Sequence, residues 1–115
     1  MNETTLPDVL RRRLYLVGRL SLATSQMQKW RQSQMAADMD AQRCEMAGDG
    51  MAQQLQRDQK LQRELHEALC RSEEAETGAA RCEALIAEIE QSLAETDREI
   101  ETLAGANSRG ERRET

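Results

Sequence analysis

Apolar side chains recur at alternating intervals of three and four residues along two long segments of the chain. The first series runs from Leu6 to Cys44 and the second from Met51 to Leu103. A repeat of about 3.5 residues keeps one stripe of an α-helix facing a partner helix. We therefore predict two long helices whose apolar stripes meet in a core seam. The seam is predicted to contain Leu6, Val9, Leu16, Leu20, Met27, Trp30, Leu61, Leu65, Ile86, Ile89, Leu93 and Ile100.

The two series are separated by Gly48-Asp49-Gly50. A glycine can end a helix in the left-handed conformation, and an aspartate can cap the next helix. The pattern thus predicts an all-α fold, a long antiparallel two-helix coiled-coil hairpin. We expect a frayed N-terminus at 1–5, a first arm at 6–47, a turn at 48–50, a second arm at 51–104 and a disordered tail at 105–115. The hairpin as a whole covers 6–104.

The start of the first arm carries helix-initiating residues. Thr5 can cap the helix, Pro7 is tolerated in the first turn, and Asp8 favours the positive end of the helix dipole. Gly78 falls inside the second arm, off the seam, where it costs about 1 kcal/mol relative to alanine.

Charge supports the antiparallel layout. Residues 1–31 hold six basic and two acidic side chains, a net charge of +4, whereas residues 73–101 hold two basic and ten acidic side chains, a net charge of −8. Folding at the turn brings these segments together, although exposed ion pairs contribute only about 0–1 kcal/mol each. A parallel dimer would instead place the acidic segments side by side.

Composition limits the size of the core. Only 38% of the residues are hydrophobic and 2% are aromatic, which suffices for a narrow bundle but not for a thick globular core. The seam is also weak near its middle and turn, where small residues such as Ala68, Ser72 and Ala75 leave room for Trp30. We expect the hairpin to be marginally stable alone and to gain from a partner.

The first arm has more apolar residues than one partner helix covers. Leu10, Leu14 and Val17 lie at i, i+4 and i+7 but off the seam, and such a surplus face is typical of a binding surface. The alternative is a wider seam that includes them. Two methionines near the turn offer flexible thioethers for adaptable contacts, or simply weak packing. The predicted partner-binding residues are Leu10, Leu14, Val17, Leu22, Met35 and Met39.

Other chemistry is sparse in the sequence. The basic triplet Arg11-Arg12-Arg13 permits contact with nucleic acid, but the net charge of −5 and the few aromatics favour pairing with the acidic arm or solvation. His66 and Cys70 have the i, i+4 spacing of two metal ligands, but two ligands alone favour a solvated face. No catalytic set, phosphate loop or cofactor motif is present, so we expect no enzyme activity, no cofactor and no metal.

The three cysteines form no C-x-x-C pair, and no apolar run approaches the roughly 20 residues of a membrane span. The first residues contain no basic start or apolar signal core. Reduced thiols and a cytoplasmic location are the expectation.

The Leu6-Pro7-Asp8-Val9-Leu10-Arg11-Arg12-Arg13 opening and two long Gln/Glu/Arg-rich arms resemble the small cytosolic stalk proteins of bacterial type III secretion and flagellar export. The central turn and polar tail add to the resemblance. It implies an antiparallel coiled coil in the central pore of a hexameric export ATPase, linking that ring to the export gate and handling substrate chaperones. This chain is short for the family, its second arm is strongly acidic, and no residue matches a functional position.

The sequence therefore predicts a non-enzymatic protein–protein interaction component, with a stalk or adaptor of a secretion apparatus as the first hypothesis. The alternatives are a self-assembling scaffold, in which two hairpins form a four-helix bundle, and a small helical adaptor or chaperone. A nucleic-acid-binding regulator rests on the basic triplet alone.

Overall fold

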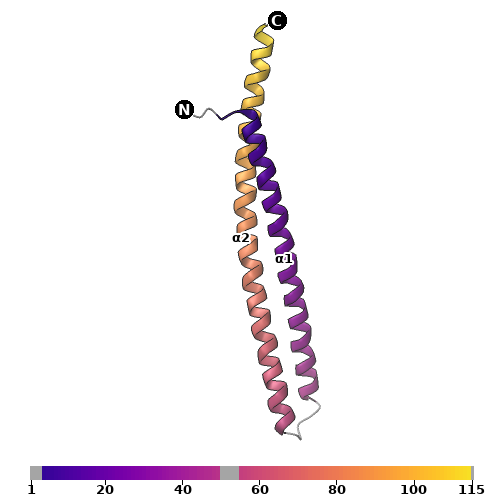
Figure 1. The fold of residues 1–115 in the computed structure, drawn as a ribbon. Helices are drawn as coiled ribbons and strands as arrows, with labels where there is room; N and C mark the ends of the chain where they lie inside the picture. The colour runs from indigo at the N-terminus through magenta and orange to yellow at the C-terminus, as the bar shows by residue number, and fades with distance from the viewer. Residues whose placement is uncertain (1–3, 50–54, 115) are drawn as a thin grey trace. The chain divides into compact units, whose positions relative to one another are not determined.

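The computed structural model describes residues 4–49 and 55–114, and the side chains of residues 4–47 and 59–106. It contains helix α1 (Leu6–Asp49) and helix α2 (Leu55–Glu114), with no strand in these ranges (Figure 1). The predicted all-α class and the antiparallel two-helix hairpin are confirmed.

Helix α1 begins in a capping arrangement at Thr5. The amide of Val9 donates to the carbonyl of Thr5 at 3.1 Å, which closes the first helical turn. The Asp8 carboxylate accepts the Thr5 hydroxyl at 2.8 Å and the Thr5 amide at 3.4 Å. Asp8 therefore reaches back to the capping residue, as the acidic member of a capping box does. These hydrogen bonds, the one from the hydroxyl first, lower the pKa of Asp8.

The helix ends differ from the predicted boundaries. Gly48 is helical, and α1 ends at Asp49 rather than at residue 47. Residues 50–54, which include part of the predicted turn and the predicted start of the second arm, lie outside the described residues. Helix α2 continues to Glu114 through the segment expected to be a disordered tail. No proline interrupts this segment, and Glu and Arg are good helix formers, so Gly105 lowers helix stability without ending the helix.

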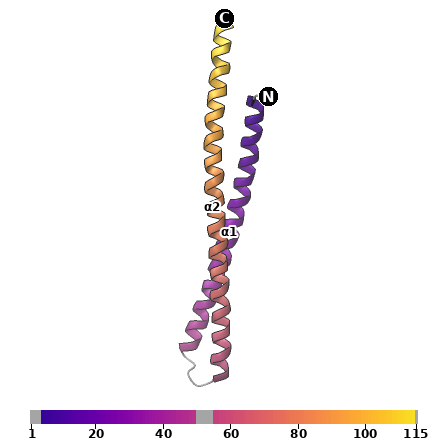
Figure 2. The ribbon, with the colours of Figure 1, turned by 90° about the vertical axis from the view of Figure 1, so that its left-hand side faces the viewer.

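The chain divides into two compact units. The terminal unit comprises residues 1–24 and 84–115, and the central unit comprises residues 25–83. In the terminal unit, the indigo start of α1 runs beside the orange part of α2, and the end of α2 continues past the first residues of α1 (Figures 1 and 2).

The core of the terminal unit is aliphatic. Leu16, Ala23 and Ile89 form a buried cluster. Four half-buried residues, Leu20, Leu85, Ile86 and Leu93, pack against it. Val9 is fully buried, and the buried Thr96 hydroxyl donates to the Ser92 carbonyl at 2.8 Å, which satisfies it without a partner from α1. Leu6, Ile100 and Leu103 are half-buried.

Ion pairs connect the two helices in this unit. Arg12 donates to Glu99 and Arg13 to Asp97, each at 2.8 Å, across sequence separations of 87 and 84 residues. Their side chains are about half exposed, so each pair adds little stability. Their value lies in the register, since basic residues of α1 meet acidic residues of α2 as the charge pattern predicts.

The central unit is built mostly from small residues. Besides Gly78, its buried residues are Ala37, Ala41, Cys44, Ala68, Ala75, Ala79 and Cys82. Met27, Leu61 and Leu65 are half-buried along the same stripes. Cross-helix contacts follow the antiparallel order, with separations falling from 52 residues at Arg31–Glu83 to 34 at Asp38–Ser72 and 20 at Cys44–Glu64.

Trp30 packs directly over Gly78 in the central unit. A Cβ atom added at Gly78 would lie 2.4 Å from both Cδ2 and Cε2 of the indole, so only glycine admits this approach. The sequence placed Trp30 against Ala68, Ser72 and Ala75, and it gave Gly78 no packing role. Trp30 remains 40% exposed, because a ring of this size cannot be enclosed between two helices. Gly78 is thus a contact position that accommodates the indole.

This contact predicts that Gly78→Ala destabilises the hairpin although alanine is the better helix former. The methyl group forces the indole to move, and overpacking of this kind costs about 1–3 kcal/mol. Three indole atoms lie within 3 Å of the added methyl group, so the upper part of this range applies and exceeds the gain in helix propensity of about 1 kcal/mol. The free energy of unfolding should therefore fall in thermal or urea melts followed by circular dichroism.

Gly18→Ala is the matched control, because a Cβ at Gly18 meets no atom within 4 Å. It should raise stability by about 1 kcal/mol. Equal stabilisation by both substitutions would show that the Trp30–Gly78 contact does not constrain the structure.

The capping arrangement predicts a pH dependence at the start of α1. Because the pKa of Asp8 is lower in the folded than in the unfolded chain, its stabilising contribution is present above the ordinary aspartate value and is lost as pH falls through the folded value. Amide exchange of residues in the first turn should accelerate over that acidic range. Asp8→Asn should remove the step, and an unshifted Asp8 carboxyl titration in NMR spectra would contradict it.

Candidate protein-binding surface

Three aliphatic side chains of α1 form an exposed row in the terminal unit. Each residue of an α-helix advances by about 100°, so Leu10, Leu14 and Val17 lie within an arc of about 60° on α1. They are 48%, 74% and 39% exposed, respectively. We refer to these three residues as the α1 strip. The seam position Leu16, by contrast, is only 8% exposed.

The α1 strip is exposed because α2 can cover only one side of α1. The seam residues Val9, Leu16 and Leu20 occupy that side, and the strip lies roughly a quarter turn away from them. The alternative of a wider seam would require the strip to be buried, which the exposed fractions do not show. Tyr15 and Leu22 are exposed as well, so α1 presents apolar groups beyond its seam.

The charges around the α1 strip are basic. No acidic residue occurs between Val9 and Ala37. Arg19 lies with its guanidinium carbon 5.9 Å from the centre of the Tyr15 ring, a cation–π distance that holds this cation beside an exposed aromatic. Arg11 is exposed on the same helix. At 100° per residue, Arg19 and Tyr15 lie on the other side of α1 from most of the strip, and Arg11 is nearer to it. The strip is therefore an apolar row on a stretch of α1 whose charged residues are all basic.

The central unit also has an exposed apolar row on α1. Met35 and Met39, both expected to bind a partner, are 66% and 64% exposed. Met46 is exposed too, and its i+11 spacing from Met35 places it on the same side of the helix. The predicted partner-binding residues include Met35 and Met39 but not Met46, although its spacing places it on the same row.

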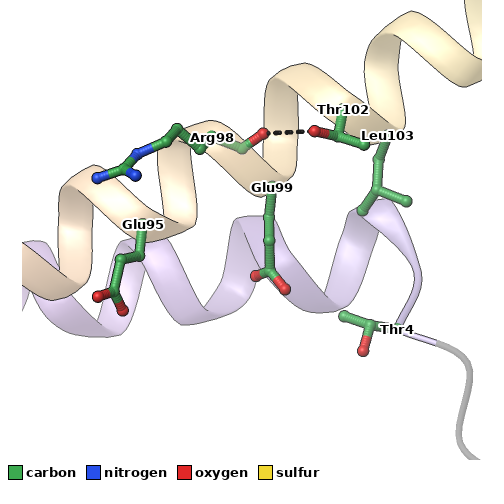
Figure 3. A pocket seen from close by; sticks show the side chains of 6 residues that line it. All are labelled: Thr4, Glu95, Arg98, Glu99, Thr102 and Leu103. Carbon is green, nitrogen blue, oxygen red and sulfur yellow. Dashed lines mark hydrogen bonds between the residues drawn. The ribbon is translucent and has the colours of Figure 1, made fainter.

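Two depressions lie on the surface of the terminal unit. The first, of about 380 Å³, is lined by Thr4, Glu95, Arg98, Glu99, Thr102 and Leu103 (Figure 3). The second, of about 370 Å³, is lined by Arg12, Leu16, Ser92, Glu95, Thr96 and Glu99.

Their chemistry does not suit small-molecule binding. Leu103 is the one apolar residue in the first lining and Leu16 the one in the second, so few aliphatic or aromatic side chains converge on either depression. Glu99 is already paired with Arg12, and the Thr102 hydroxyl donates to the Arg98 carbonyl at 3.0 Å. Glu99 and Thr102 are therefore engaged by their own neighbours.

The cysteines lie either in the buried seam or on the exposed side of α2. Cys44 and Cys82 are buried free cysteines, and Cys70 is an exposed one. Cys70 Sγ lies 3.6 Å from His66 Nε2 on the exposed side of α2. Within the described residues, no group of three or more His, Cys, Asp or Glu side chains is arranged to hold a metal ion.

No helix in the described part of the chain has an apolar stretch long enough to cross a membrane. Comparisons of the chain with models of protein families, with curated proteins and with solved structures found no match. The resemblance to type III secretion stalk proteins thus stays a prediction from the sequence.

The division between strip and seam predicts different effects of the same truncation. Leu14→Ala should change the free energy of unfolding by no more than about 0.5 kcal/mol, as is typical of exposed positions. Leu16→Ala should lower it by about 2 kcal/mol or more, because a buried leucine loses its packing. Urea melts of the two variants measure the contrast, and similar losses would place Leu14 in the core.

Proposed function

We propose that the chain is a non-enzymatic helical adaptor that binds a partner protein through the α1 strip. The observation that carries the proposal is the exposure of Leu10, Leu14 and Val17 as a row beside the seam. Exposed apolar groups that lie together, rather than singly, are typical of protein-binding surfaces. Burial of the row would supply apolar contact that the two-helix core lacks.

The charges around the row indicate the chemistry of the partner. A stretch of α1 without acidic residues favours a surface that is apolar at its centre and acidic at its rim. An amphipathic helix with acidic flanks has this pattern, and it would lie along α1 as a third helix. Arg12 and Arg13 pair with α2. Arg11, about 60° from Leu14 around the helix, is left as the basic group at the rim of the row.

The resemblance to export stalk proteins gives this proposal its most specific form, in which the partner is a hexameric export ATPase or an export-gate component. The antiparallel hairpin and the exposed α1 strip are compatible with that role. Two other occupants remain as outcomes of the test: a second hairpin, which would complete a four-helix bundle, and an anionic membrane surface, which also attracts apolar and basic helices.

Glutamate substitutions in the α1 strip should abolish partner binding while helicity is retained. Leu14→Glu and Val17→Glu place a charge in the apolar row, and we expect each to weaken binding at least about tenfold, as truncation of a central interface residue does. Binding to a purified export ATPase hexamer, to anionic vesicles and to the chain itself can be measured by sedimentation.

Ala94→Glu is the matched control, since it adds the same charge at an exposed position of α2 in the same unit. This variant should bind as the parent chain does. Binding to the ATPase that is lost only in the strip variants supports the stalk form, whereas strip-dependent binding to vesicles or self-association replaces it. Equal binding by all variants overturns the role of the strip.

A further inference from the structure

His66 and Cys70 present two metal-binding atoms at the separation that a zinc ion requires. Their Nε2 and Sγ atoms lie 3.6 Å apart. In a tetrahedral site with Zn–S near 2.3 Å and Zn–N near 2.0–2.1 Å, these two ligand atoms are about 3.6 Å apart. One helical turn of α2 therefore offers two corners of a zinc tetrahedron.

The pair lies on the outer side of α2. Ala68, Ser72 and Ala75 mark the seam side of the helix in the central unit, and His66 and Cys70 lie nearly half a turn of arc from them. Both side chains are exposed, and neither is used by the packing against α1. A metal held here would keep two coordination positions directed away from the hairpin.

We propose that His66 and Cys70 form half of a zinc site, which the same two residues of a second copy of this chain complete. A second copy supplies one nitrogen and one sulfur, so the full set is Cys2His2, a common tetrahedral zinc environment. Binding converts each thiol to a thiolate with release of its proton, so the affinity falls as the pH is lowered. This surface is independent of the α1 strip.

The charges on either side of the pair favour an antiparallel arrangement of two copies. Arg63 precedes His66 by three residues, and Glu73 follows Cys70 by three residues. A two-fold axis through the metal therefore places Arg63 of each copy opposite Glu73 of the other, with Glu74 adjacent. All three are exposed, and this self-complementarity is what a two-fold interface requires.

An exposed apolar residue adjoins the same surface. Leu69 is 47% exposed and lies three residues after His66, hence on the neighbouring part of the helix face. Two copies joined at the metal would each bring Leu69 to the edge of the contact. The contact is small, so the metal supplies most of the association, and we expect the dimer to require zinc.

Titration of the reduced chain of residues 1–115 with Co²⁺ and Zn²⁺ tests the proposal. We expect the absorption of tetrahedral cobalt with thiolate ligands, one metal ion per two chains, and a doubling of mass in sedimentation equilibrium that a chelator reverses. One metal ion per chain without a change in mass, or no saturable binding, overturns it.

Variants assign the ligands. Removing a residue that only hydrogen-bonds to a metal ligand typically weakens metal binding about 10- to 100-fold. His66→Ala and Cys70→Ser remove the ligands themselves and should weaken metal binding at least as much. Cys82→Ala removes a buried thiol and should leave the titration unchanged, with helicity checked by circular dichroism. Arg63→Glu should weaken the dimer, and the double substitution Arg63→Glu with Glu73→Arg should restore it. Zinc-dependent dimerisation that persists in Cys70→Ser overturns the assignment of the ligands.

Discussion

A hairpin of two helices buries one stripe of each helix, and the other features of this structure depend on that limit. In the terminal unit the stripes carry Leu16 and Ile89, whose side chains are long enough to form an aliphatic cluster. In the central unit they carry mostly alanine and cysteine. Within the described residues neither helix packs against a third one, so large apolar side chains outside the stripes remain in contact with solvent. The exposed α1 strip is a direct consequence of this geometry.

The small residues of the central unit explain why one large side chain is important there. Alanine stripes bury little area per residue and do little to distinguish one alignment of the helices from another. Trp30 over Gly78 is different, because an indole fits only where the opposite helix lacks a Cβ atom. A shift by one turn would place the ring against a side chain. The contact therefore specifies the register of a seam that is otherwise nearly uniform.

The heptad spacing predicted the seam because periodicity depends only on helix geometry. The same count found the α1 strip, since a residue off the stripe of a two-helix hairpin must be exposed. Contacts across the helices could not be obtained in this way. Whether Trp30 meets Ala75 or Gly78 depends on a shift of less than one turn, which no repeat specifies. The end of α2 was also missed, because Gly105 and a polar composition weaken a helix without stopping it.

The three cysteines show how heptad position determines chemistry in a chain of this kind. Cys44 and Cys82 fall on the stripes, where a thiol behaves as a small apolar group and is closed to metals and oxidants. Cys70 falls on the outer side of α2, one turn after the only histidine of the chain. A spacing of four residues on a helix brings two side chains within reach of one ion without help from the fold. The outer face of α2 can therefore carry a ligand pair without loss of packing in the seam. A substitution there changes metal binding without changing the helix packing.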